Sequence, residues 1–205
     1  DLDLENGRLM RQTQTTTLMG MTTEFVEILT YDERGLCTEM QDSEDRYHHY
    51  FTYTPDGRIA KDVLISSGDT LSVIEVLAYD ADGNIAETQN TSFDSPVITR
   101  INRLTWQDGD LVKVVTEYVT EDKETDTTTL NYDNYPSAYI GYPEAIAIND
   151  VFFLARHNSK HNLIRRGCTP AYENGRIVSL IKDDGTDNTY FTYDDGTGQH
   201  ENPGQ

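Results

Sequence analysis

Residues 51–90 read FTYTPDGRIAKDVLISSGDTLSVIEVLAYDADGNIAETQN and contain one short pattern twice. In each copy, at residues 53–59 and 79–85, a tyrosine is followed by three residues, a glycine, one further residue and an isoleucine. Further copies occupy residues 31–35, 106–109, 172–175 and 193–196, and residues 4–7 form a weaker one. A pattern that returns along most of the chain indicates a repeated structural unit.

The spacing within the pattern matches two kinds of β-turn. In the shorter copies, Asp-Gly or Asn-Gly favours a two-residue type I′ turn, in which both central residues have positive φ. In the longer copies, a type I turn followed by glycine in the left-handed conformation, with a β-bulge, accounts for the extra residue. Each copy therefore predicts the tip of a β-hairpin, with the aromatic residue just before the turn.

The sequence on either side of the turns alternates as β-strands do, for example in residues 25–31, 47–53 and 71–79. The glycines at 35, 57, 83 and 109 are 22 or 26 residues apart, the length of two strands with their turns. The sequence thus predicts a mainly β fold, a single curved antiparallel meander of roughly ten to twelve strands, open or partly closed into a barrel-like sheet. We expect one domain over residues 1–205.

One segment, about residues 130–168, interrupts the repeat. Pro143 and Glu144 can begin a helix, and four apolar residues then share one face at helical spacing: Ile148, Val151, Phe152 and Ala155. We expect one short helix near residues 144–156, ended by Asn158-Ser159. A helix inserted in a curved meander usually plugs an end or covers an open face.

The charge of the chain limits its partners. It carries 36 acidic and 16 basic side chains, a formal net charge of −20. Such a field repels phosphate backbones and anionic lipid headgroups, so we expect no nucleic-acid and no membrane-surface binding. The sequence lacks the run of roughly 18 apolar residues that a membrane-spanning helix needs. We expect a monomer without a membrane span.

The repeats also carry a family resemblance. FTYTPDGRIAKDV, LAYDADGNIAET and YENGRIVSLIKDDGTDNTYFTYDD resemble YD or RHS repeats, whose hairpins build curved sheets. With the helix-bearing insertion and the segment Ser159–Leu163, the chain is similar to a family of secreted Bacteroidetes proteins, a domain of unknown function with a porin-like fold. The resemblance implies a barrel-like sheet and export to the periplasm or cell surface as a lipoprotein anchored upstream of Asp1. It implies no enzymatic activity.

Signatures of catalysis and metal binding are weak. The Asp-rich turns do not fit the EF-hand pattern, and the best remaining acidic cluster, Asp183–Asn188, already has the sequence of a turn. His157 and His161 have zinc-ligand spacing without the glutamate of zinc proteases, and His48 and His49 point to opposite faces of a strand. Neither a nucleophile motif nor a phosphate-binding loop occurs. We expect no metal, no cofactor and no enzyme activity.

The two cysteines, Cys37 and Cys168, lack metal-binding spacing. A disulfide in an oxidising compartment and two small buried apolar side chains are equally compatible with the sequence.

These observations favour a non-enzymatic cell-envelope protein that binds a ligand or partner, such as a glycan or a peptide. We predict the contact surface in the insertion, where four tyrosines supply rings with an apolar face and a polar tip: Tyr132, Tyr135, Tyr139 and Tyr142. The alternative for such tyrosines is packing of a loop onto its own sheet. Two alternatives for the whole protein are a structural scaffold without a small ligand and a hydrolase whose carboxylates or histidines the fold brings together.

Overall fold

The computed structural model describes residues 2–5, 8–18, 21–119, 124–137, 144–148, 150–164, 168–173, 176–182, 189–193 and 199–203. Its main element is an antiparallel sheet of 11 strands that pair in chain order. They are β1 (Leu2–Glu5), β2 (Arg8–Leu18), β3 (Met21–Tyr31), β4 (Cys37–Asp42), β5 (Tyr47–Tyr53), β6 (Ile59–Ser66), β7 (Asp69–Tyr79), β8 (Ile85–Ser92), β9 (Ile98–Gln107), β10 (Asp110–Tyr118) and β11 (Thr125–Thr129). The predicted curved β-meander is confirmed.

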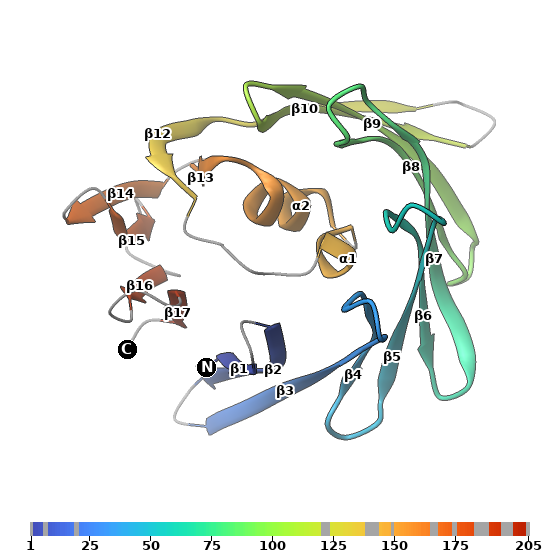
Figure 1. The fold of residues 1–205 in the computed structure, drawn as a ribbon, viewed down its shortest axis with the longest axis horizontal. Helices are drawn as coiled ribbons and strands as arrows, with labels where there is room; N and C mark the ends of the chain where they lie inside the picture. Colours follow the sequence, from blue (N-terminus) through green and yellow to red (C-terminus); the bar gives the residue numbers. More distant parts are fainter. Residues whose placement is uncertain are drawn as a thin grey trace.

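The large sheet curves around the helical insertion. Figure 1 shows the strands following an open curve, with the helices on its inner side. Within the described residues β1 pairs only with β2 and β11 only with β10, so the sheet is open rather than closed into a barrel. Its core lies between the inner face of the strands and the helices, where Met40 and Phe51 join the same buried cluster as Ala145 and Leu154.

The hairpin tips have both predicted turn types. At the three longer copies the glycine amide donates to the carbonyl of the residue three positions earlier, for example Gly57 N to Thr54 O at 2.9 Å. Gly57 has φ of 87°, and the strand register shifts next to Tyr53, as a bulge requires. At the shorter copy, Asp108 and Gly109 have φ of 54° and 90°, which defines a type I′ turn.

The repeated aromatic residue connects each hairpin to the preceding one. Its ring N–H or hydroxyl donates to the backbone carbonyl of the buried residue two positions after the preceding turn glycine. Four of these bonds join Tyr31 to Leu9, Tyr53 to Cys37, Tyr79 to Ile59 and Trp106 to Ile85, and Tyr132, which follows the last of these copies without belonging to one, makes a fifth to Leu111; all five are 2.5 to 2.9 Å long. We call them the inter-hairpin hydrogen bonds. Because all five acceptor residues are at most 2% exposed, each bond satisfies a carbonyl in the core.

The helix expected near residues 144–156 is present and consists of two short segments. They are α1 (Glu144–Ala147) and α2 (Val151–Asn158), and strands β12 (Tyr132–Pro136) and β13 (His161–Leu163) pair around them. The helix restarts because Asp150 caps α2: its carboxylate accepts from the Phe152 amide at 2.7 Å. The predicted apolar face is also partly wrong, since Phe152 is 52% exposed whereas Leu154 and Ala155 are buried.

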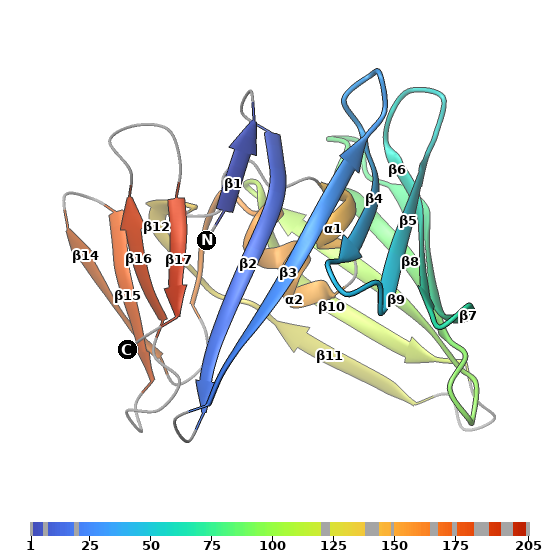
Figure 2. The same cartoon turned by 90° about the horizontal axis from the view of Figure 1, so that it is seen from below.

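A second sheet of four strands follows the insertion: β14 (Cys168–Glu173), β15 (Arg176–Lys182), β16 (Thr189–Tyr193) and β17 (Gln199–Pro203). Figures 1 and 2 place it beside β12 on one side and near β1 on the other. Tyr172 anchors it to β12, because its hydroxyl donates to Asp133 and its ring packs 4.3 Å from that of Tyr135. The tips of its hairpins lie outside the described residues.

Both cysteines are free thiols in the structure, and of the two only Cys37 is buried, since Cys168 is partly exposed. Cys37 is buried at the position after a turn where other copies have isoleucine or leucine, and burial raises the pKa of its thiol to about 12. Within the described part of the chain, each helix is too short or too polar to cross a membrane.

Candidate functional site

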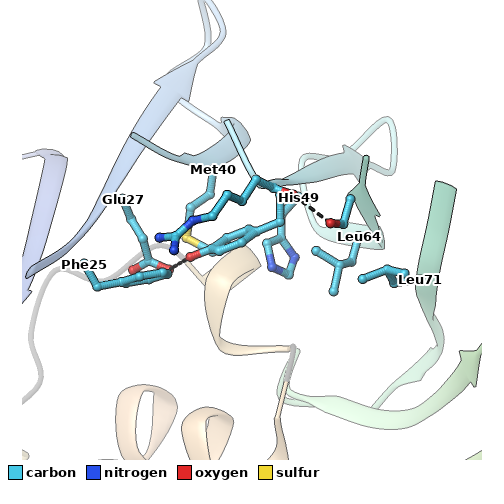
Figure 3. Close-up of a pocket in the computed structure, with 9 residues that line it drawn as sticks. Phe25, Glu27, Met40, His49, Leu64 and Leu71 are labelled. Carbon is cyan, nitrogen blue, oxygen red and sulfur yellow. Dashed lines mark hydrogen bonds between the residues drawn. The ribbon is translucent and has the colours of Figure 1, made fainter. Parts of the chain in front are cut away.

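A pocket of about 460 Å³ opens on the inner face of the large sheet, between β3 and β7. Its side chains share that face because they alternate with outward-facing residues along each strand. Figure 3 shows Glu27 at one end of the lining and Leu64 and Leu71 at the other, with His49 between them. The full lining consists of Phe25, Glu27, Met40, Arg46, Tyr47, His49, Leu64, Ser66 and Leu71. The pocket therefore combines an apolar wall with a few polar groups, the usual composition of a small-molecule site.

The turn between β4 and β5 forms the rim of the pocket, and Asp42 holds it in place. The Asp42 carboxylate, 1% exposed, accepts from the backbone amide and the guanidinium of Arg46, both at 2.5 Å. Burial alone would raise the pKa of Asp42, but these hydrogen bonds hold it below its ordinary value. Ser66 on β6 donates to the Arg46 carbonyl at 2.7 Å, which ties the neighbouring turn to the same rim.

Glu27 is the acidic group inside the pocket. The hydroxyl of Tyr47 donates to its Oε1 at 3.0 Å, and its Oε2 accepts no hydrogen bond from the described residues. The Tyr47 ring also stacks on Phe25, at 5.6 Å between ring centroids. Desolvation by these surroundings raises the pKa of Glu27 despite the hydrogen bond from Tyr47, which lowers it. The pKa of Tyr47 is raised as well, first by burial and then by the charge of Glu27.

His49 forms a buried pair with Asp62 at the base of the pocket. The side chains are 5% and 2% exposed, and His49 Nδ1 lies 2.9 and 3.0 Å from the two carboxylate oxygens. Because a carboxylate only accepts hydrogen bonds, Nδ1 carries a proton that faces Asp62, and the neutral tautomer with this proton has Nε2 as an acceptor. Nε2 has no hydrogen-bonding partner among the described residues, although buried polar atoms are normally paired.

A second cavity of about 430 Å³ lies near the N-terminal strands and is lined by Glu5, Arg8, Met10, Leu29, Thr30 and Tyr31. Tyr31 already belongs to an inter-hairpin hydrogen bond. The Arg8 guanidinium lies 5.8 Å from the centre of the Tyr31 ring. This cavity contains one basic and one acidic side chain, and both come from the edge of the sheet. It is the weaker candidate because it lacks a buried polar atom without a partner within the described residues.

The four predicted tyrosines divide into three cases. Tyr132 is half-buried, donates to Leu111 O and accepts from Ser159 Oγ at 2.9 Å, so its hydroxyl is used within the fold. Tyr135 is 39% exposed on β12 and stacks on Tyr172. Tyr139 and Tyr142 lie outside the described residues. A binding surface in the insertion stays a prediction.

The remaining histidines with described side chains have structural partners. His48 lies on the outer face between Glu39 and Asp45, at 2.9 and 2.6 Å, and these hydrogen bonds raise its pKa. His161 lies 2.7 Å from Asp110, across the junction of β10 and β13. The side chain of His157 and the acidic cluster at 183–188 lie outside the description. Among the residues that are described, three or more His, Cys, Asp or Glu side chains do not gather at any metal-binding distance.

The sequence did not single out Glu27 or His49. The signal for His49 was its place in the alternating segment 47–53, which puts it on the same face as Tyr47 and Phe51. Its partner Asp62 lies on β6, diagonally opposite in a register that pairs His49 with Leu64. That register becomes known only from the fold.

Comparison with other proteins gives little on function. No family model matches the chain. No curated protein matches it either. A solved structure described as the crystal structure of TcdB2-TccC3-TEV is similar, with 14% sequence identity and a TM-score of 0.30. The match covers 87% of this chain and 11% of that chain.

Proposed function

We propose that the protein is a non-enzymatic ligand-binding module whose binding site is the pocket between β3 and β7. The observation that carries the proposal is the buried imidazole of His49, which lines the pocket and whose Nε2 has no partner among the described residues. A buried acceptor left unpaired costs about 1–3 kcal/mol, and a ligand that donates to it recovers this free energy. The volume of about 460 Å³ lies within the usual range of small-molecule sites.

A ligand screen with a matched pair of variants tests this proposal. Leu71 lines the pocket, whereas Leu77 on the same strand is 50% exposed. Leu71→Trp should fill the pocket and abolish the thermal stabilisation by any ligand found, whereas Leu77→Trp should leave it intact. A broad metabolite library without a stabilising ligand would favour the structural scaffold instead. Equal binding by both variants would place the ligand elsewhere, as in the predicted tyrosine surface.

A second candidate function, a hydrolase, is favoured by the pair of His49 with Asp62 beside a glutamate of raised pKa. The two hydroxyls that line the pocket already donate elsewhere: Tyr47 to Glu27 and Ser66 to Arg46. A hydrolase here would therefore use His49 to activate water, without a covalent intermediate on either hydroxyl. Turnover of chromogenic esters or glycosides that His49→Gln abolishes would establish this function in place of the first.

The cellular setting of the proposal comes from the family resemblance. We infer an exported envelope protein, held by a lipid on a cysteine upstream of Asp1, that meets its ligand outside the cytoplasm. Radiolabelled palmitate incorporated by the full-length protein in its native host would support the anchor. A protein recovered entirely from the cytoplasmic fraction would contradict export.

A further inference from the structure

The hydrogen-bonding groups that face the pocket define the chemistry of its ligand. Two atoms of the lining residues accept no hydrogen bond from the described residues, Glu27 Oε2 and His49 Nε2. Glu27 Oε2 is an acceptor because a carboxylate has no proton to donate, and His49 Nε2 is one in the neutral tautomer whose proton faces Asp62 on Nδ1. Tyr47 lies between them, with its hydroxyl on Glu27 and its ring centroid 5.8 Å from that of His49. A ligand that pairs with these atoms must therefore supply hydrogen-bond donors.

The charges around the pocket favour a cationic donor. Arg46 is the basic side chain of the lining, and it is already paired with Asp42 at 2.5 Å and lies near Glu44 at 3.4 Å. Glu27 and the pair of His49 with Asp62 remain without a cation of their own among the described residues. The net charge of −20 adds a field that attracts positive ligands and repels anions.

The rest of the lining is apolar. Phe25, Met40, Leu64 and Leu71 surround the polar groups, and Met40 is 4% exposed. In Figure 3, Leu64 and Leu71 lie on the far side of His49 from Glu27. A ligand that reaches from the acceptors to these side chains needs a charged end and an apolar body.

We propose that the pocket binds a small primary amine with an apolar body, whose ammonium group donates to Glu27 Oε2. An ammonium group has three donors and no acceptor, so it pairs with the carboxylate and keeps two N–H groups for water or for other acceptors of the pocket. The apolar body lies against Met40, Leu64 and Leu71 and gains free energy by leaving water. The inference rests on the proposed function, because it names the ligand class of the same pocket.

The test compares three probes of nearly equal shape with the full chain by isothermal titration calorimetry at low ionic strength. They are 2-phenylethylamine, 2-phenylethanol and phenylacetate, which are cationic, neutral and anionic. The amine should bind about tenfold or more tightly than the alcohol, the difference expected for one charge-assisted hydrogen bond. The carboxylate should bind most weakly.

A matched pair of variants tests the role of Glu27. Glu27→Gln should reduce the preference for the amine to about threefold or less, since a neutral amide loses the charge-assisted bond. Glu75→Gln is the control, because it removes the same charge from an outer-face ion pair with Lys61. It should retain the full preference.

The outcomes separate this inference from the proposed function. If the alcohol binds as tightly as the amine, or if Glu27→Gln and Glu75→Gln behave alike, the amine inference is overturned. If 2-phenylethanol binds to the protein but not to Leu71→Trp, the proposal that this pocket is the ligand site still holds. If no probe binds, the amine inference is overturned as well, and the library screen alone then decides the proposed function.

Discussion

Replacing Tyr79 by phenylalanine removes one inter-hairpin hydrogen bond and leaves the ring in place. The hydroxyl of Tyr79 donates to the carbonyl of Ile59, a residue with 0% exposure. The guanidinium of Arg58, 5.1 Å from the centre of the Tyr79 ring, can still pack on phenylalanine. The change therefore removes the hydrogen bond between adjacent hairpins and keeps the packing of the ring.

We expect Tyr79→Phe to lower the free energy of unfolding by about 1–2 kcal/mol, because a net hydrogen bond is lost and a buried carbonyl loses a partner. For a chain of this length, that corresponds to a fall in Tm of roughly 3–6 °C. Urea unfolding followed by circular dichroism measures it. Tyr118→Phe is the control, since the Tyr118 hydroxyl has no hydrogen bond within the described residues, and it should change stability by less than about 0.5 kcal/mol.

The same reasoning predicts that the stability losses from separate inter-hairpin hydrogen bonds add up. Tyr31, Tyr53 and Tyr79 lie on successive hairpins and use separate acceptors, so the triple phenylalanine variant should lose about 3–6 kcal/mol. The reasoning would be refuted by a urea midpoint for Tyr79→Phe that matches Tyr118→Phe, or by a triple variant no less stable than the single one.

Three further predictions concern the pocket and the turns. Glu27 has a raised pKa in the folded state, so the folded protein holds its proton more tightly and stability should fall as pH rises above the ordinary value of 4.5. Glu27→Gln should flatten this part of the stability curve in urea titrations between pH 4 and 8, and an unchanged slope would contradict the assignment. His49→Phe should lower the free energy of unfolding by about 3 kcal/mol, because it leaves the Asp62 carboxylate buried without its partner. Adding Asp62→Leu should restore part of this loss. A double variant less stable than His49→Phe alone would argue against a buried pair. Gly57 has φ of 87° and open space where a Cβ would lie, so Gly57→Ala should lower the free energy of unfolding by about 1 kcal/mol through backbone strain alone. Gly57→Asn should lower it by less. Equal midpoints for both Gly57 variants in thermal unfolding would count against that turn geometry.

The hairpins could be predicted from the sequence because their determinants are local. Gly57 and Gly83 follow their aromatic residues at a spacing that only a type I turn with a bulge accommodates. The inter-hairpin hydrogen bonds were not predicted, since they join residues about 20 positions apart through the curvature of the sheet. The sequence did contain a signal for them: every repeat aromatic is tyrosine or tryptophan, which can donate, and never phenylalanine.

The site was harder to predict than the fold. Glu27 and Tyr47 lie on β3 and β5, which are separated by β4, so their contact depends on side chains that reach across a strand. With 36 acidic residues in the chain, the sequence alone could not distinguish Glu27 from the others. The helix break was missed for a local reason, because Asp150 can cap a new helix as readily as it can continue one.

The central claim is that the inner-face pocket is the ligand site, and the methionine methyl groups report on it directly. Met40 lines this pocket and Met10 lines the second cavity. In a sample with ¹³C-labelled methionine methyls, assigned with Met40→Leu and Met10→Leu, 2-phenylethylamine should shift the Met40 signal progressively and leave Met10 unchanged. A titration that shifts Met10 while Met40 stays still would contradict the account.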